Sequence, residues 1–192
     1  MAAAVDATIS AISELGYQRT TMREICHRAG LSQGAVTRHF PTRLDLIAAA
    51  ADEVARRQEA RYLELVAEAP PGAPPATTAV TILRNGTRHP LNAVWLELAV
   101  AARTTPELAA RMGPAVDGAY TKTMAMASLV PGASRLDPLD LKTVVMSLIH
   151  LFNGEALSRA VVQMPEVEDR RLEVVSAALA QLLNAAKPGL PG

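Results

Sequence analysis

Aromatic residues are scarce in this sequence: Phe, Trp and Tyr together make up 3% of its 192 residues. The hydrophobic 49% of the chain therefore consists mainly of Ala, Leu, Val, Ile and Met. Ala and Leu are among the residues that cost least to place in a helix. Alternating runs of β-branched and aromatic residues, the pattern of a strand, are nearly absent. The composition predicts an all-α fold.

The chain has a single cysteine and no formal net charge. With only Cys26 available, no disulfide framework forms within the chain, and a reducing compartment is expected. The neighbours of Cys26 place it on the apolar face of a helix, which favours a buried, unreactive thiol. A net charge of zero excludes a uniformly basic coat for nucleic acid, but it leaves room for a local basic patch.

Long hydrophobic runs and catalytic motifs are also missing. No uncharged run reaches the ~18 residues of a membrane helix, and residues 1–5 lack the positive start of a signal peptide. There is no zinc-protease His-Glu-x-x-His, no phosphate-binding glycine loop and no nucleophile elbow, and the four histidines are scattered. We therefore expect a cytoplasmic protein with no membrane partner, no cofactor, no metal and no enzymatic activity.

Helix boundaries are strongly marked in the first 45 residues. Apolar residues at helical spacing predict a first helix that ends at Gly16. The Thr-x-x-Glu motif at 21–24 is a capping box, in which the Thr21 hydroxyl accepts from the Glu24 amide and the Glu24 side chain reaches back. Gly30 ends this second helix, Ser32 caps a third, and Pro41 closes it. Three helices of about 10, 8 and 8 residues are predicted.

The rest of the chain predicts further helices. Residues 43–67 form one unbroken helix, about 35 Å long at 1.5 Å per residue, and the Pro/Gly cluster at 70–75 forms a loop. Gly113-Pro114 is expected to kink its helix. The later helices are expected at 77–85, 91–103, 106–129, 138–162 and 165–186, followed by a frayed tail at 187–192.

Charge and geometry together favour a DNA-binding head. Between Tyr17 and Arg43 there are five arginines and one acidic residue, a basic bias that suits duplex DNA. Two short helices joined by a tight glycine turn, with a supporting first helix, make a helix-turn-helix whose third helix enters the major groove. Gly34 allows the backbone to approach DNA closely. The outward residues of the third helix form a plausible base-reading set: Gln33, Ala35, Thr37, Arg38 and His39.

Three segments carry a resemblance to a known family. Residues 16–25 (Gly-Tyr-Gln-Arg-Thr-Thr-Met-Arg-Glu-Ile), 28–36 (Arg-Ala-Gly-Leu-Ser-Gln-Gly-Ala-Val) and 39–46 (His-Phe-Pro-Thr-Arg-Leu-Asp-Leu) resemble the signature of the tetracycline-repressor-like (TetR) family. The resemblance implies a homodimeric repressor that leaves a palindromic operator when a small-molecule inducer binds. It implies a three-helix head at residues 1–45 and a ligand-binding and dimerising body of about six helices at 46–192.

The resemblance also assigns roles to single residues. Thr21, Arg43 and the helix start at Ser32 would touch phosphate, while Gln33, Ala35, Thr37 and Arg38 would face bases or the adjoining backbone, with His39 near the end of the helix. Two features depart from the family. Thr37 stands where an aromatic residue, mostly Tyr, is usual, and residues 1–8 contain none of the basic side chains of a minor-groove arm.

The body offers candidate ligand contacts and a candidate dimer interface. An apolar pocket with a few polar groups is predicted from Trp95, Tyr120, Met124, Met146, His150 and Asn153. Alternatively, the Met side chains and Trp95 belong to the core, and His150 to the core or an interface. The two long carboxy-terminal helices have more apolar surface than one neighbour covers, and the resemblance implies that they pair with a second copy as a four-helix bundle; alternatively they only close the monomer core.

The competing function is a ligand-binding helical protein whose head has degenerated and no longer binds an operator. The basic bias of residues 17–43 argues against it.

Overall fold

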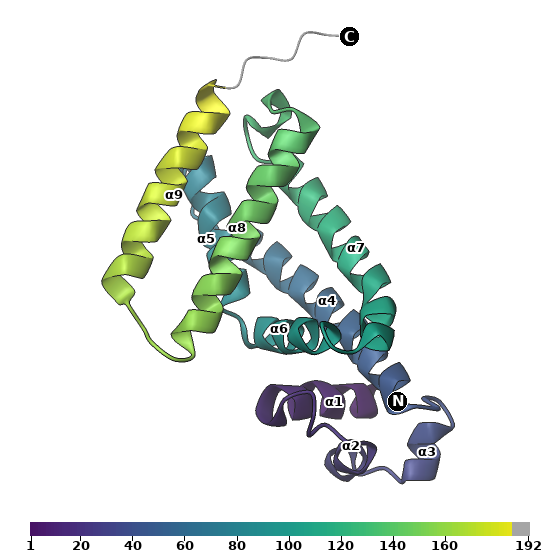
Figure 1. The fold of residues 1–192 in the computed structure, drawn as a ribbon. Helices are drawn as coiled ribbons and strands as arrows, with labels where there is room; N and C mark the ends of the chain where they lie inside the picture. The colour runs from purple at the N-terminus through teal and green to yellow at the C-terminus, as the bar shows by residue number, and fades with distance from the viewer. Residues whose placement is uncertain (186–192) are drawn as a thin grey trace. The chain divides into compact units, whose positions relative to one another are not determined.

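The structure, a computed structural model, describes residues 1–185, and these residues form helices and no strand (Figure 1). The predicted all-α class is therefore confirmed. The expected tail at 187–192 lies outside the described residues. The α-helices are α1 (Ala2–Leu15), α2 (Met22–Ala29), α3 (Gln33–Thr37), α4 (Arg43–Ala67), α5 (Pro75–Thr87), α6 (Pro90–Ala102), α7 (Pro106–Ser128), α8 (Pro138–Arg159) and α9 (Pro165–Ala185), with a 3-10 turn η1 (Ala133–Arg135).

Most helix boundaries lie within a few residues of the sequence predictions, and two differ for clear reasons. The helix α5 is longer than predicted because Pro75 occupies its first position, where no backbone N–H is needed. The helix α3 has five residues instead of eight. The amide of His39 bonds to the carbonyl of Val36 at 3.0 Å, a tighter i→i+3 turn, because the residue before Pro41 is disfavoured in a helix.

Reciprocal capping is complete at the start of α4 and only half formed at the predicted capping box of α2. At the start of α4, Thr42 and Asp45 cap each other: the Asp45 amide donates to Thr42 Oγ1 at 3.1 Å, and the Thr42 amide donates to Asp45 Oδ2 at 3.0 Å. At the start of α2, the Glu24 amide donates to Thr21 Oγ1 at 3.2 Å. The predicted return bond from the Glu24 side chain was wrong, because that carboxylate accepts from Arg28 Nε at 2.6 Å instead.

The chain divides into two compact units. Of the described residues, the first unit contains 1–60 and 89–119, and the second contains 61–88 and 120–185. The helices α4 and α7 each pass from one unit into the other. The helix-turn-helix thus shares its unit with α6 and the first half of α7. A boundary between functional domains at residue 45 stays a prediction.

The first unit has two adjoining hydrophobic clusters. One packs α2 and α3 under α1 and the start of α4, through buried Ile25, Cys26, Val36 and Leu46. The thiol of Cys26 is buried, as expected from its place on the apolar face. The other cluster joins α1 and α4 to α6 and α7. Its buried members are Ile9, Ile12, Tyr17, Ile47, Ala50, Ala51, Val54, Val94, Leu98, Leu108 and Met112.

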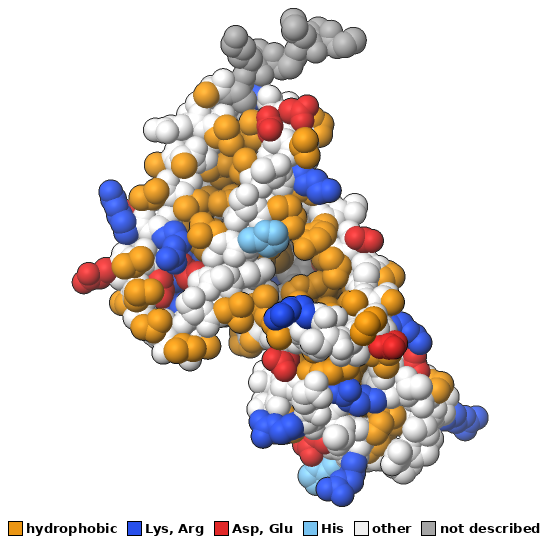
Figure 2. All heavy atoms as spheres, in the orientation of Figure 1, with side chains coloured by type: hydrophobic (Ala, Val, Ile, Leu, Met, Phe, Trp, Pro, Cys, Tyr) orange, Lys and Arg blue, Asp and Glu red, His pale blue; other side chains and the backbone are white. Residues whose placement is uncertain are grey.

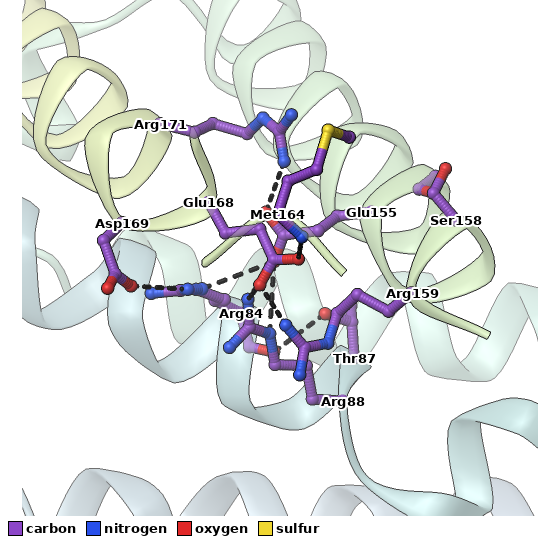
Figure 3. Close-up of polar contacts among 11 residues, drawn as sticks. Arg84, Thr87, Arg88, Glu155, Ser158, Arg159, Met164, Glu168, Asp169 and Arg171 are labelled. Carbon is purple, nitrogen blue, oxygen red and sulfur yellow. Dashed lines mark hydrogen bonds and ion pairs between the residues drawn. The ribbon is translucent and has the colours of Figure 1, made fainter. Parts of the chain in front are cut away.

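The second unit combines a small hydrophobic cluster with buried charges. Ala76, Ala133 and Leu183 are buried together, and Phe152 of α8 is fully buried. Arg84 of α5 pairs with Glu155 of α8, and Arg88, the residue after α5, pairs with Glu168 of α9 (Figure 3). Across the described residues, no helix is both long enough and apolar enough to span a bilayer.

Candidate DNA interface and ligand-binding residues

The turn between α2 and α3 depends on one glycine. Gly30 has φ 64 and ψ 30, the left-handed conformation. Its amide donates to the carbonyl of His27 at 3.3 Å, and the Leu31 amide donates to the carbonyl of Cys26 at 3.0 Å. This pair of bonds is the Schellman arrangement, which closes the end of a helix and redirects the chain. It sets the direction in which α3 leaves α2.

The helix α3 presents one buried and several exposed side chains. Ser32 caps it, with its hydroxyl accepting from the Ala35 amide at 3.2 Å. Val36 is fully buried and anchors the helix to the core. Of the other predicted reading residues, Thr37 is half-buried and the rest are exposed: Gln33, Gly34, Ala35, Arg38 and His39. The structure therefore brings the predicted base-reading residues together on one exposed surface.

The side chain of Thr37 is turned toward its own helix. Its hydroxyl donates to the carbonyl of Gln33 at 3.0 Å, a back-bond that threonine commonly makes in helices. The only polar atom of the Thr37 side chain is therefore engaged within α3.

The arginines of the head fall into two groups. Arg23 and Arg38 are exposed, and no described residue forms a hydrogen bond or ion pair with either guanidinium. Arg28 instead ties α2 to α1, because it donates to Glu24 at 2.6 Å and to Glu14 at 2.8 Å. These bonds lower the pKa of Glu14 and raise that of Arg28. Figure 2 shows separate basic side chains spread over the part of the molecule that contains α1, α2 and α3.

Arg43, a predicted phosphate contact, has a second role in the structure. Its guanidinium donates to the carbonyl of Thr20 at 2.5 Å and to that of Tyr17, and it stacks 4.2 Å from the centre of the Tyr17 ring. Arg43 therefore holds the connection between α1 and α2 against the start of α4. Its contact with phosphate stays a prediction.

The predicted ligand contacts are divided between the two units. Trp95 lies on α6 in the first unit, half-buried against its core. The other five lie in the second unit, Tyr120 and Met124 on α7 and Met146, His150 and Asn153 on α8. Met124, Met146 and Asn153 are half-buried, whereas Tyr120 is 40% exposed and His150 is exposed.

Sequence reasoning missed two polar clusters. Glu97 of α6 accepts a hydrogen bond from the Tyr17 amide at 2.7 Å; its only sequence signal was a charge interrupting the apolar run at 93–102. The second cluster surrounds Glu155, whose side chain is 2% exposed (Figure 3). Its signal was a pair of arginines four residues apart, Arg84 in α5 and Arg88 directly after it, a spacing that places two side chains on one side of a helical turn.

Burial alone would raise the pKa of the Glu155 carboxyl. Hydrogen bonds from Arg88 and Arg171, with the charges of Arg88 and Arg84, outweigh this effect and hold the pKa below its ordinary value. Glu168 accepts from Arg88 at 2.9 Å, from Arg159 and from the Met164 amide at 3.1 Å. The cluster therefore joins α5, α8 and α9 through ion pairs around two buried carboxylates, those of Glu155 and Glu168.

Comparison with known proteins decides the family. A family profile described as bacterial regulatory proteins, tetR family, matches residues 4–50. Over 175 residues the chain is 38% identical to an uncharacterized HTH-type transcriptional regulator of Mycobacterium tuberculosis, a match that spans 91% of this chain and 90% of that protein. The chain belongs to the tetR family of bacterial regulatory proteins.

Solved structures agree with this assignment at the level of the fold. A transcriptional regulator from Rhodococcus sp. Rha1 matches with a TM-score of 0.71 at 22% identity, covering 99% of this chain and 98% of that one. The multidrug binding protein EbrR, complexed with imidazole, matches with a TM-score of 0.68 at 20% identity, covering 100% and 96%. This tetR-family chain is thus a helix-turn-helix transcriptional regulator, as the sequence predicted.

Proposed function

We propose that this tetR-family regulator is a homodimeric repressor that binds a palindromic operator and leaves it when a small molecule binds. The observation that carries the proposal is the exposed surface of α3 over the buried anchor Val36. In this proposal α3 enters the major groove, where Gln33 and Arg38 pair with base edges and Ala35 and the Thr37 methyl contact thymine. His39 and Gly34 adjoin this surface.

Phosphate contacts complete the proposed interface. The hydroxyl of Thr21 and the start of α3 at Ser32 are exposed, and Arg43 lies at the first position of α4. Contacts of this kind set the register on the duplex without reading its sequence.

Operator binding is tested with the DNA upstream of the coding sequence against unrelated DNA of equal length, by fluorescence anisotropy over a salt series. The proposal expects selective binding by two protomers and a loss of at least about tenfold in affinity for Arg38→Ala. Arg135→Ala is the matched control, because Arg135 is exposed in the 3-10 turn η1 of the second unit, outside the head and outside α8 and α9. Equal, weak binding to both DNAs would favour a ligand-binding protein with a degenerate head.

The proposed dimer interface is the exposed face of α8 and α9. Between residues 147 and 161, the exposed residues of α8 and its end include no Asp, Glu, Lys or Arg: Ser147, His150, Leu151, Gly154, Leu157, Ser158, Ala160 and Val161. A face made mostly of small and apolar residues suits close packing against a second copy of itself. The exposure of His150 on this face favours an interface role for it over a ligand contact.

A single charge placed on this face tests the dimer. Leu157 is 51% exposed on α8, and Leu63 is 56% exposed on α4. We expect Leu157→Glu to give monomers in sedimentation equilibrium and to lose operator binding, while Leu63→Glu behaves as the parent protein. A dimer of unchanged stability in Leu157→Glu would place the interface elsewhere.

For the inducer we propose an apolar or amphipathic small molecule that contacts Tyr120, Met124, Met146 and Asn153 in the second unit. EbrR, which shares the fold, is a multidrug binding protein, and α4 runs from the DNA-reading head into the second unit. Isothermal titration calorimetry with a compound panel measures ligand binding. An inducer must lower the affinity of the protein for operator by the same factor by which operator lowers the affinity of the protein for the inducer. A ligand that leaves the operator affinity unchanged would refute the coupling.

A further inference from the structure

The exposed residues of α8 between 143 and 158 form a continuous stripe along the helix. They recur every three or four residues, the spacing that places side chains on one side of a helix. This α8 stripe consists of Thr143, Ser147, His150, Leu151, Gly154, Leu157 and Ser158. It lies within the second unit and belongs to the face proposed above as the dimer interface, so its meaning rests on that proposed dimer.

The hydroxyl groups of the α8 stripe are bonded to their own helix. Thr143 Oγ1 donates to the carbonyl of Leu139 at 2.8 Å, and Ser147 Oγ donates to that of Thr143 at 2.7 Å. Ser158 Oγ donates to the carbonyl of Gly154 at 2.9 Å. Because these back-bonds already occupy the hydroxyl donors, a second helix can cover the stripe without leaving a hydroxyl hydrogen unpaired.

His150 is different from the other members of the α8 stripe. Among the described residues, none forms a hydrogen bond or ion pair with its imidazole. Histidine is also the side chain that ordinarily changes its charge between pH 5 and pH 8, whereas the other six members do not titrate in that range. The positions three and four residues from His150 are uncharged as well: Met146, Ser147, Asn153 and Gly154. The charge of the stripe therefore depends on His150.

The carboxylates on the helices around this part of α8 are bound by arginines. Glu155, five residues after His150, is buried and binds Arg84 of α5 and Arg171 of α9. On the exposed side of α9, Glu173 pairs with Arg170 at 2.7 Å. The second-unit part of α7 adds two titratable groups that carry no negative charge at neutral pH, Tyr120 and Lys122.

We propose that His150 makes the dimer dependent on pH. The α8 stripe accepts a second copy of the chain while His150 is neutral, and it rejects that copy once His150 is protonated. The interface of a two-fold dimer contains the same surface from both protomers, so two imidazoles are covered together. Covering a charged group without a partner is costly, and two such charges also repel each other. Acidification thereby separates the protomers and removes the paired heads that the operator requires.

The sign and size of the effect follow from proton linkage. Protonation is open to the monomer and closed to the dimer, so the full affinity is present above pH about 6.5 and is lost as the pH falls below it. For an ordinary histidine, complete exclusion of the protonated form weakens association by about tenfold between pH 7.5 and pH 5.5. Two histidines give a loss of up to about 100-fold.

Sedimentation equilibrium at pH 7.5 and pH 5.5, at constant ionic strength, measures the dimer dissociation constant directly. We expect the parent protein to associate at least about tenfold more weakly at pH 5.5, with its far-UV circular dichroism unchanged. His150→Gln, which does not titrate, should show the same dissociation constant at both pH values. His27→Gln is the matched control and should keep the parent response, because His27 is exposed on α2 in the first unit.

Two further variants test the charge itself and protect the experiment if glutamine disturbs the packing. His150→Lys carries a permanent charge and should be monomeric and folded at pH 7.5. His150→Leu carries none and should be dimeric at both pH values. A dimer of parental affinity in His150→Lys would overturn the proposal.

The parent protein separates this inference from the proposed dimer. A parent protein that is monomeric at pH 7.5 would overturn the dimer, whereas a dimer of equal affinity at both pH values would overturn the role of His150 alone. A pH response that persists in both His150→Gln and His150→Leu would assign the effect to another group. Tighter association at pH 5.5 would also overturn the proposal, because protonated His150 would then be paired with a carboxylate of the second copy.

Discussion

At the scale of single residues, two glycines in the head have opposite requirements. Gly30 needs its left-handed φ of 64, although no atom lies within 4 Å of a Cβ placed there. Gly30→Ala is therefore expected to cost about 1–2 kcal/mol of unfolding free energy through backbone conformation alone. Gly34 lies inside a helix, and no atom lies within 4 Å of a Cβ placed there either. Gly34→Ala should therefore raise the unfolding free energy by up to about 1 kcal/mol, because alanine loses less conformational freedom in a helix than glycine does.

Urea denaturation of both glycine variants checks this prediction. Equal changes in the two would mean that the conformation at Gly30 does not limit the turn between α2 and α3. Gly34→Ala also separates stability from DNA recognition. The added methyl group should stabilise the fold, but it should weaken operator binding because the backbone at Gly34 is proposed to lie close to DNA.

Glu155 is the residue whose charge matters most for the second unit. Its buried carboxylate pairs with Arg84, Arg88 and Arg171. Removing one partner from a buried ion pair leaves the others uncompensated, so Glu155→Gln should cost at least about 3 kcal/mol. Asp169→Asn is the control, because this carboxylate is 72% exposed and a surface pair contributes less than about 1 kcal/mol. Similar losses for both in denaturant unfolding would show that the cluster contributes little.

At the scale of elements, α4 owes part of its stability to an ionised carboxylate. A hydrogen bond from Arg56 lowers the pKa of the Glu53 carboxyl, partial burial raises it, and a hydrogen bond from Arg57 lowers it again. The net result is a pKa that falls from 4.5 to about 2. Arg57 also donates to Asp6 and so ties α4 to α1. Because the pKa is lowered in the folded state, the stabilisation is present above pH about 4.5 and is lost as the pH falls toward about 2.

Unfolding free energies measured between pH 6 and pH 3 test this effect. The decrease with falling pH should be smaller in Glu53→Gln than in the parent protein. Glu64→Gln, on the same helix but with its side chain 60% exposed, should follow the parent curve. Identical slopes in the parent protein and Glu53→Gln would show that other carboxylates control the acid stability.

At the scale of the whole molecule, zero net charge is combined with a basic head. Arg23 is exposed on α2 without a partner among the described residues, whereas Arg28 on the same helix is engaged by Glu14 and Glu24. Arg23→Ala is expected to reduce the slope of log affinity against log salt by about one. Arg28→Ala should lower the thermal stability and leave the salt slope unchanged; the reverse pattern in anisotropy titrations would contradict this assignment.

The sequence by itself determined which segments are helical and which family the chain belongs to. Caps, proline positions and apolar spacing are local properties, so the start of α4 at Arg43 and of α8 at Pro138 could be predicted from neighbouring residues. The same holds for the exposed residues of α3, because Val36 marks its buried side. The short length of α3 was missed because the turn at His39 depends on how the chain meets Pro41.

Only the tertiary structure decided the partners of the charged side chains. Some arginines face solvent, and others are bound by partners within the fold. The difference depends on contacts between residues far apart in the sequence: Arg28 with Glu14, Arg43 with Tyr17, and Arg84 with Glu155. A count of charges treats all of them alike. For the same reason Glu97, a lone charge in an apolar run, shows its hydrogen bond to Tyr17 only when two segments 80 residues apart are folded together.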